Sequence, residues 1–318
     1  MSQRVRSMAV AGVVLLALLS LAGSRSGWWL SHTASGANAN ADAVAGGDGG
    51  GLPRATPLDE RMDAAALERA LQDSATAGLQ ALVVMRDGYV VFERYGRGFA
   101  GDTVVDGGSF ARGVLGLVAG IAVENATLSP DALQGFDPDA LRAAIEAGAH
   151  QSYSAYLSHK LWSRLNAGAA SFEYSAAVRG PADCCLHARV LDWMRLASLL
   201  TDNGRFEGKQ LVSNGWLQRM QRPLAPDSVR GFGIELAAAA HGAEPFAMPG
   251  VFFLRGPEHW RLWLVPPLKL AILFGASGSD STPLWDETRL PNLVVRAVSD
   301  RPPQAGDLSE LQRLVPGH

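Results

Sequence analysis

The segments of this chain with β-type sequence fall into two groups, and a long helix-rich region separates them. The first group, residues 79–95, has two apolar runs around Asp87-Gly88, a pair that is typical of a hairpin turn. The second group, residues 232–274, contains four short apolar runs, with Pro266-Pro267 as a turn between the last two. This segregation predicts an α+β fold with a mostly antiparallel sheet.

Helices are predicted from apolar spacing and from end signals. Asp59 can cap a helix that continues to Ala75, and residues 113–123 are apolar on nearly all sides, as in a buried helix. Further helical segments are expected at residues 138–165, at 188–200, from Ser213 and at 285–298. No internal repeat is visible. We therefore expect one domain over residues 58–300 and a tail over 301–318.

The N-terminus has the pattern of an export signal. Arg4 and Arg6 precede an apolar run from Met8 to Gly23, which is short for a membrane span and normal for a signal peptide. Trp28-Trp29 keeps the alternative of an uncleaved anchor open. Residues 24–57 are mostly small or polar and predict a flexible linker. We expect an exported protein, periplasmic or membrane-anchored and facing the periplasm.

Composition excludes some classes of partner and gives no oligomeric state. Hydrophobic residues make up 47% of the 318 residues, enough for a sizeable core, and the net charge is -3. No basic stripe indicates a nucleic-acid partner. The two cysteines, Cys184 and Cys185, are adjacent and are interpreted as buried thiols. His187 beside them is weak evidence for zinc, so we expect no metal and no cofactor.

The order of several short motifs resembles that of the β-lactamase and penicillin-binding-protein superfamily, in its class C β-lactamase, esterase and 6-aminohexanoate-dimer hydrolase branch. The similar segments are the hairpin Leu82–Val91, Ser109 with Gly116 and Gly120, Cys184-Cys185-Leu186 followed by Asp192-Trp193, Gly208–Val212, and Gly231-Phe232-Gly233. The resemblance implies an antiparallel sheet covered by N- and C-terminal helices, with a helical subdomain that is shortened in this chain.

The first motif of these enzymes, S-x-x-K, places a nucleophilic serine at a helix start and a lysine base one turn later. This chain has Ser109-Phe110-Ala111-Arg112 at that position. The resemblance implies that Ser109 is the nucleophile. Arg112 cannot accept a proton at neutral pH, because a guanidinium is already protonated there and has only N–H donors.

The other two motifs also differ from the family pattern. Tyr153 matches the tyrosine of the Y-x-N motif, but the asparagine is missing. Either this motif is lost, or Tyr153 acts as the base instead. The K-T-G motif maps to Leu254-Arg255-Gly256, where Gly256 leaves room for substrate and Arg255 keeps a positive charge. His259 is either a displaced catalytic histidine or a residue in a turn. An oxyanion would be held by N–H groups near Ser109 and in residues 255–257.

Two function classes follow from these residues. One is an acyl-serine hydrolase of small esters or amides of the cell envelope, impaired by the loss of the lysine. The alternative is an inactive pseudoenzyme that binds an anionic ligand or acts as a scaffold. In that case Arg112 and Arg255 would face the cleft and hold a carboxylate or phosphate, unless Arg112 forms a salt bridge with Asp106.

Overall fold

A computed structural model describes residues 41–74, 78–133, 135–173, 185–278 and 285–301 of the chain. The predicted signal or anchor segment, residues 1–23, lies outside these ranges, as does all but the first residue of the predicted tail. Within the described part, no helix is both long enough and apolar enough to cross a membrane.

The large sheet joins strands from the two ends of the domain, as the sequence predicts. Its strand order is β3-β2-β12-β11-β10-β9, and every neighbouring pair is antiparallel. The strands are β2 (Leu79–Arg86), β3 (Tyr89–Tyr95), β9 (Glu235–Leu236), β10 (Phe252–Arg255), β11 (Arg261–Val265) and β12 (Leu270–Ala276). Leu82 pairs with Phe274, so an early hairpin and a late strand form the centre of one sheet.

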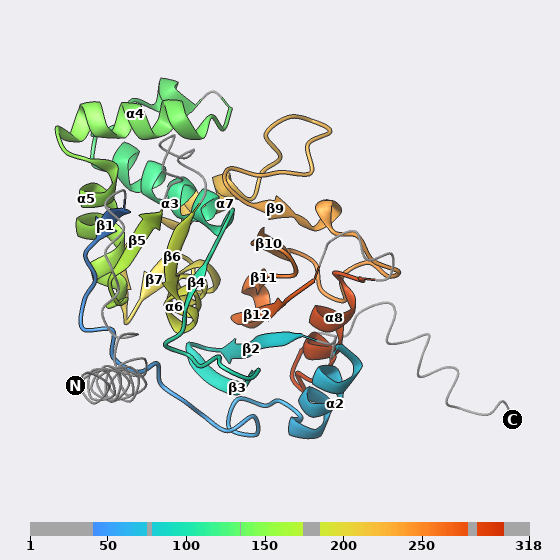
Figure 1. Ribbon diagram of the computed structural model, residues 1–318. Coiled ribbons are helices and arrows are strands. Elements are labelled where there is room, and N and C mark those ends of the chain that lie inside the picture. Colours follow the sequence, from blue (N-terminus) through green and yellow to red (C-terminus); the bar gives the residue numbers. More distant parts are fainter. Residues whose placement is uncertain (1–40, 75–77, 134, 174–184, 279–284, 302–318) are drawn as a thin grey trace, which may run out of the picture. The chain divides into compact units, whose positions relative to one another are not determined.

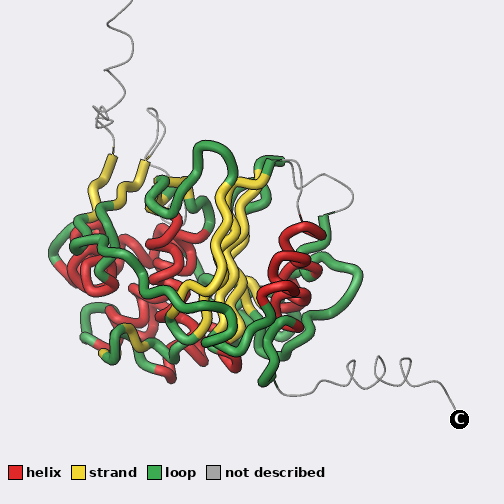
Figure 2. The backbone as a smooth tube through the Cα atoms, turned by 90° about the horizontal axis from the view of Figure 1, so that it is seen from below, coloured by secondary structure: helices red, strands yellow, loops and turns green. Residues whose placement is uncertain are grey.

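Helices cover both faces of this sheet, which confirms the α+β prediction (Figures 1 and 2). On one face lie α2 (Ala64–Ser74) and α8 (Arg289–Arg296), packed on a core that includes Leu82 and Val84. On the other face lie α3 (Phe110–Glu124) and α6 (Val190–Thr201), packed on a core that includes Val83 and Met85. Alternation along the central strands therefore divides their buried apolar side chains between two cores.

The helix-rich region contains several short elements. They are α4 (Pro138–Ala149), α5 (Tyr153–Leu157), a π-helical turn at Ser158–Trp162, and α7 (Asn214–Met220). His150 has a positive φ of 52° and ends α4, so the helix-rich part predicted over 138–165 consists of several elements. Asp63 caps α2 by accepting hydrogen bonds from the N–H groups of Ala65 and Ala66 (2.8 and 3.1 Å). The helix therefore starts later than predicted from Asp59.

A small second sheet, absent from the sequence prediction, lies beside the helices. Its order is β1 (Ala41–Val44), β5 (Ala170–Glu173), β6 (Leu186–Arg189) and β4 (Val104–Asp106), and β7 (Arg205–Phe206) and β8 (Lys209–Gln210) form a separate hairpin. These strands have two to four residues, too few for a periodic pattern. Cys185 precedes β6 and is disulfide-bonded, so the prediction of a free thiol is wrong there. Cys184 lies outside the described residues.

Residues 41–57, which we call the N-terminal strap, pack against the domain instead of forming a flexible linker. Strand β1 pairs with β5, with Val44 opposite Ala170. The carbonyl oxygen of Gly50 accepts a hydrogen bond from the buried Arg195 of α6. The prediction of a linker over 24–57 is therefore wrong for residues 41–57, and residues 24–40 lie outside the described ranges.

The end of the strap binds the edge of the large sheet. The N–H of Val90 donates to the carbonyl of Pro53 (2.9 Å), and the N–H of Ala55 donates to the carbonyl of Val90 (3.2 Å). Arg54 forms an ion pair with Glu93 (2.8 Å). The strap thus contacts both the helical region and the outer strand β3, and links two parts of the domain that are distant in sequence.

Deleting residues 41–57 from the full chain should lower the free energy of unfolding by about 3 kcal/mol or more. The deletion removes two buried side chains, Val44 and Leu52, each of which stabilises by about 1.5–3 kcal/mol, and it exposes Arg195 without its carbonyl partner. Urea denaturation of the two proteins measures the difference. Equal transition midpoints with equal slopes would show that the strap is not part of the folded domain.

Candidate active site

Ser109 lies at the start of α3, directly after the tight turn Gly107-Gly108 that follows β4. The N–H of Gly107 donates to the carbonyl of Leu186 (3.0 Å), and the N–H of Gly108 donates to the carboxylate of Asp106 (2.7 Å). Gly108 has a φ of +49°, in the left-handed region. Ser109 is exposed, and its hydroxyl does not cap the helix. The helix N-terminus therefore presents an accessible hydroxyl in a region of positive potential.

The end of β10 lies directly against this turn. A Cβ on Gly108 would be 2.7 Å from the Pro257 Cδ atom and 3.0 Å from the Pro257 nitrogen. On the following turn, a Cβ on Gly113 would be 2.7 Å from Leu254. The structure thus brings Gly256-Pro257 beside Ser109, the arrangement that the resemblance implies for the first and third motifs.

Residues 256 and 257 cannot stabilise an oxyanion as the sequence comparison suggests. The N–H of Gly256 donates to the carbonyl of Trp260 (2.8 Å) within the turn between β10 and β11. Pro257 has no N–H, and its Cδ atom points towards Gly108. The strand therefore presents a methylene group beside Ser109 where a hydrogen-bond donor is expected.

Arg112 lies one turn after Ser109 and is half-buried. Its guanidinium lies 5.1 Å from the centroid of the Phe136 ring, a distance typical of a cation–π contact. A guanidinium has only N–H donors, so it can attract an anion but cannot take the proton of a serine. Among the described residues, no side chain forms a hydrogen bond with the Ser109 hydroxyl.

Tyr153 does not reach the surface near Ser109. Its side chain is fully buried in the helical region, 5.7 Å from the Phe172 ring and 5.8 Å from the guanidinium of Arg142. The carboxylate of Glu146 accepts the Tyr153 backbone N–H (2.9 Å). A general base must reach the proton that it removes, and a tyrosine enclosed in a core cannot do so. Tyr153 as a substitute base is not supported by this placement.

Arg255 faces away from Ser109, because strand alternation assigns it to the opposite side of the sheet. Leu254 contacts α3, so its neighbour Arg255 lies on the α8 side. There Arg255 binds both oxygens of Glu287, and Arg261 binds the same carboxylate (2.7 Å). Arg112 and Arg255 therefore do not form one anion site, and this part of the prediction is wrong.

His259 has structural contacts in the turn between β10 and β11. It is 4% exposed, and its ring is stacked on Trp285 with centroids 4.6 Å apart and an interplanar angle of 6°. A Cβ on Gly278 would be 2.9 Å from the His259 ring. Of the two interpretations of His259, this placement favours the residue in a turn.

His187 is a titratable residue near the Ser109 turn that the motifs did not identify. Strand pairing places it opposite Asp106 on β4 and opposite Ser171 on β5. Its Nδ1 is 3.0 Å from the Cys185 carbonyl oxygen, and its Nε2 is 4.0 Å from the Glu173 carboxylate. If Nδ1 carries the proton, Nε2 is free to accept one. No sequence spacing indicates this pair, because only the β4–β6 register brings Asp106 and His187 together.

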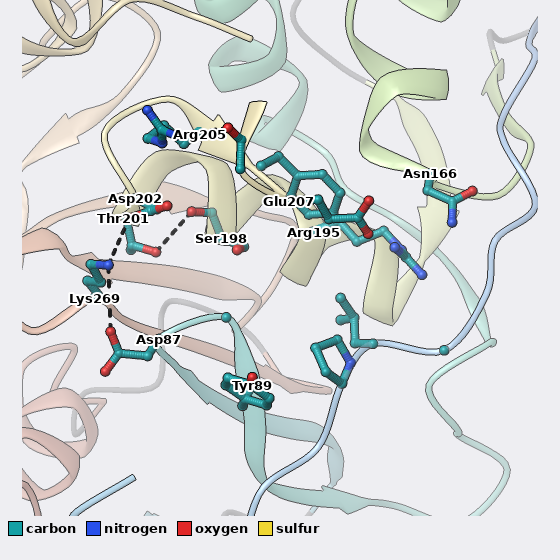
Figure 3. A pocket seen from close by; sticks show the side chains of 16 residues that line it. Asp87, Tyr89, Asn166, Arg195, Ser198, Thr201, Asp202, Arg205, Glu207 and Lys269 are labelled. Carbon is teal, nitrogen blue, oxygen red and sulfur yellow. Dashed lines mark hydrogen bonds and ion pairs between the residues drawn. The ribbon is translucent and has the colours of Figure 1, made fainter. Parts of the chain in front are cut away.

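A cavity of about 300 Å³ lies at the opposite end of the large sheet (Figure 3). It is enclosed by the N-terminal strap, the β2–β3 turn, the end of α6 and the β7–β8 hairpin. Lys269 lies between Asp202 (3.0 Å) and Asp87 (3.8 Å). The hydrogen bond with Asp202 raises the pKa of Lys269, so Lys269 is a fixed cation and not a base. The lining contains three acidic and three basic side chains, so the cavity has no preference for an anionic or a cationic ligand.

No cluster of three His, Cys, Asp or Glu side chains within the described ranges could hold a metal ion. The candidate site therefore consists of the exposed Ser109, the half-buried Arg112 and the turn Gly256-Pro257. It has a cation and a hydroxyl, but in the described part of the chain no base is hydrogen-bonded to that hydroxyl, and Gly256-Pro257 offers no free N–H donor.

Solved structures with the same fold share little sequence with this chain. A protein assigned as a 6-aminohexanoate-dimer hydrolase from Bacillus anthracis aligns with 87% of this chain and 92% of its own, with a TM-score of 0.60 and 14% identity. A protein assigned as a β-lactamase from Bacteroides dorei aligns with 76% of this chain and 98% of its own, with a TM-score of 0.58 and 17% identity. A penicillin-binding-protein homologue from Caulobacter crescentus aligns with 80% of this chain and 100% of its own, with a TM-score of 0.54 and 12% identity.

No protein-family model and no curated protein matches the chain. The structural similarities nevertheless agree with the resemblance read from the motifs. The chain has the β-lactamase and penicillin-binding-protein fold.

Replacing Glu287 by Gln should lower the free energy of unfolding by about 3 kcal/mol or more, because removal of one partner leaves buried positive charge uncompensated. Glu244→Gln is a matched control, since Glu244 also binds an arginine, Arg296 (2.8 Å), but is exposed. The control should change stability by less than about 0.5 kcal/mol. Thermal and urea denaturation of the parent and the two variants measure these changes in the free energy of unfolding. Equal effects of the two substitutions would contradict a structural role of Arg255 with Glu287.

Proposed function

We propose that this protein is an exported, periplasmic or membrane-anchored β-lactamase-fold protein that has lost efficient acyl transfer and acts by binding. The observation that carries the proposal is the pair of changes on either side of Ser109. Arg112 stands where a base is needed, and Pro257 lies where the strand should donate a hydrogen bond. One change removes activation of the nucleophile and the other removes stabilisation of the oxyanion.

The size of the two losses supports binding over turnover. A positioned general base contributes about 10²–10⁴-fold to rate. One oxyanion-hole donor contributes about 10²–10³-fold. Together they would slow acyl transfer by about four orders of magnitude or more, so that a bound ester or amide would leave unchanged much more often than it reacts.

A second candidate function is slow hydrolysis of small esters or amides of the cell envelope through an acyl-Ser109 intermediate. The observation that favours it is the accessible hydroxyl of Ser109 at the positive end of α3. His187 is the titratable group to examine if such activity exists, because β4–β6 pairing places it beside Asp106, three residues before Ser109.

Labelling of the full chain with a fluorophosphonate probe and with a penicillin should separate the two functions. We expect no adduct on the parent protein by intact-mass spectrometry. The double variant Arg112→Lys/Pro257→Ala restores a possible base and a backbone N–H, and its labelling rate should rise at least tenfold. Adding Ser109→Ala to this variant should abolish labelling. Rapid labelling of parent Ser109, absent in Ser109→Ala, would establish the hydrolase instead.

A further inference from the structure

A surface groove of about 440 Å³ lies beside helix α7, on the α3 side of the large sheet. It is bordered by α7, by the 3-10 turn Pro130–Leu133 and by the loop that follows α7. Its lining residues are Leu133, Gly135, Gly215, Arg219, Arg222, Pro223, Leu224 and Phe232. Six of these eight residues are apolar or glycine, and the other two are arginines.

The two arginines give the groove a clear charge preference. Arg219 and Arg222 are exposed, and neither forms an ion pair with any residue in the described part of the chain. They are three residues apart at the end of α7, where the N–H of Arg222 donates to the carbonyl of Arg219 (3.1 Å), and both line the groove. The acids on the flanking segments, Asp131 and Asp227, do not line the groove. Two guanidiniums without carboxylates favour a carboxylate or a similar anion, which they can bind by paired hydrogen bonds.

The wall of the groove belongs to a row of aromatic rings that ends at the Ser109 helix. Arg219 lies 5.5 Å from the Trp216 ring, and Trp216 lies 5.5 Å from Phe232. Phe232 contacts Phe136 edge-to-face at 4.9 Å, and Arg112 lies over Phe136. Trp216 and Phe232 are buried and held by packing, so this side of the groove keeps its shape before a ligand binds.

The remaining wall is apolar and leaves room for a chain. Leu133 and Phe232 are almost fully buried beneath the groove, and Leu224 is 40% exposed at its rim. A Cβ on Gly135 would meet no atom within 4 Å, and a Cβ on Gly215 would meet only Ser213 Oγ at 3.9 Å. Leu133 and Phe232 form the floor, and the apolar surface that an aliphatic ligand would remove from water belongs to the exposed Pro223 and Leu224.

We propose that this groove binds an amphiphilic carboxylate, a fatty-acid-like molecule whose carboxylate lies between Arg219 and Arg222 and whose chain lies along Pro223 and Leu224. The site is separate from the Ser109 turn and does not require that Ser109 be reactive or inert. The same chain with a positive head group would place its charge against two cations, so binding depends on the sign of the head group.

Isothermal titration of the full chain with decanoate tests the proposal, with decylamine as a ligand of the same length and opposite charge. Decanoate should bind saturably, and decylamine should bind at least tenfold more weakly. Arg219→Gln/Arg222→Gln should weaken decanoate binding at least tenfold. Arg97→Gln/Arg164→Gln, a control in which two other exposed arginines without ion pairs to described residues are replaced, should bind decanoate as the parent does.

Two further variants locate the ligand. Gly215→Leu fills the groove from a helical position with open space and should reduce decanoate binding at least tenfold without unfolding the protein, as circular dichroism would show. Ser109→Ala should leave binding unchanged, which separates this site from the proposed function. Equal binding of decanoate and decylamine, or parent-like binding by folded Gly215→Leu and by the Arg219/Arg222 double variant, would overturn the proposal.

Discussion

The contact of α3 with β10 and α7 has almost no space between its parts, and both surfaces considered for function depend on it. A Cβ on Gly113 would lie 2.7 Å from Leu254, and a Cβ on Gly120 would lie 2.2 Å from the Trp216 ring. Larger residues at either position would move the helix away from the sheet or from α7. The contact therefore places the Ser109 turn beside Gly256-Pro257 and holds Trp216 against Phe232, which lines the groove.

The two faces of the large sheet place Arg112 and Arg255 in different surroundings. On β10, Leu254 belongs to the core under α3, whereas the half-buried Arg255 lies on the α8 side and binds Glu287. Glu287 is buried there with Arg255 and Arg261, and a buried carboxylate of this kind requires its cationic partners. A positive charge that the motif order assigns to the substrate cleft is thus used to hold the C-terminal helix region on the sheet.

The Ser109 site combines a retained scaffold with altered chemistry. The turn, the exposed hydroxyl and the helix N-terminus remain, and they require only backbone geometry and small residues. Proton acceptance and oxyanion donation require particular groups, and Arg112 and Pro257 supply neither. Under the proposed function this is sufficient, because binding needs only shape and fixed charge.

The sequence by itself determined the order of elements, the α+β class, the resemblance to β-lactamase-like proteins and the inability of Arg112 to act as a base. These follow from local turn signals, apolar periodicity and side-chain chemistry. Only the tertiary structure decided that residues 41–57 are a strap, that Tyr153 is enclosed, that Arg255 faces Glu287, and that Pro257 contacts the Ser109 turn. Each depends on pairing between segments far apart in the chain: strand register and alternation set which face a side chain occupies, and a single sequence does not specify that register.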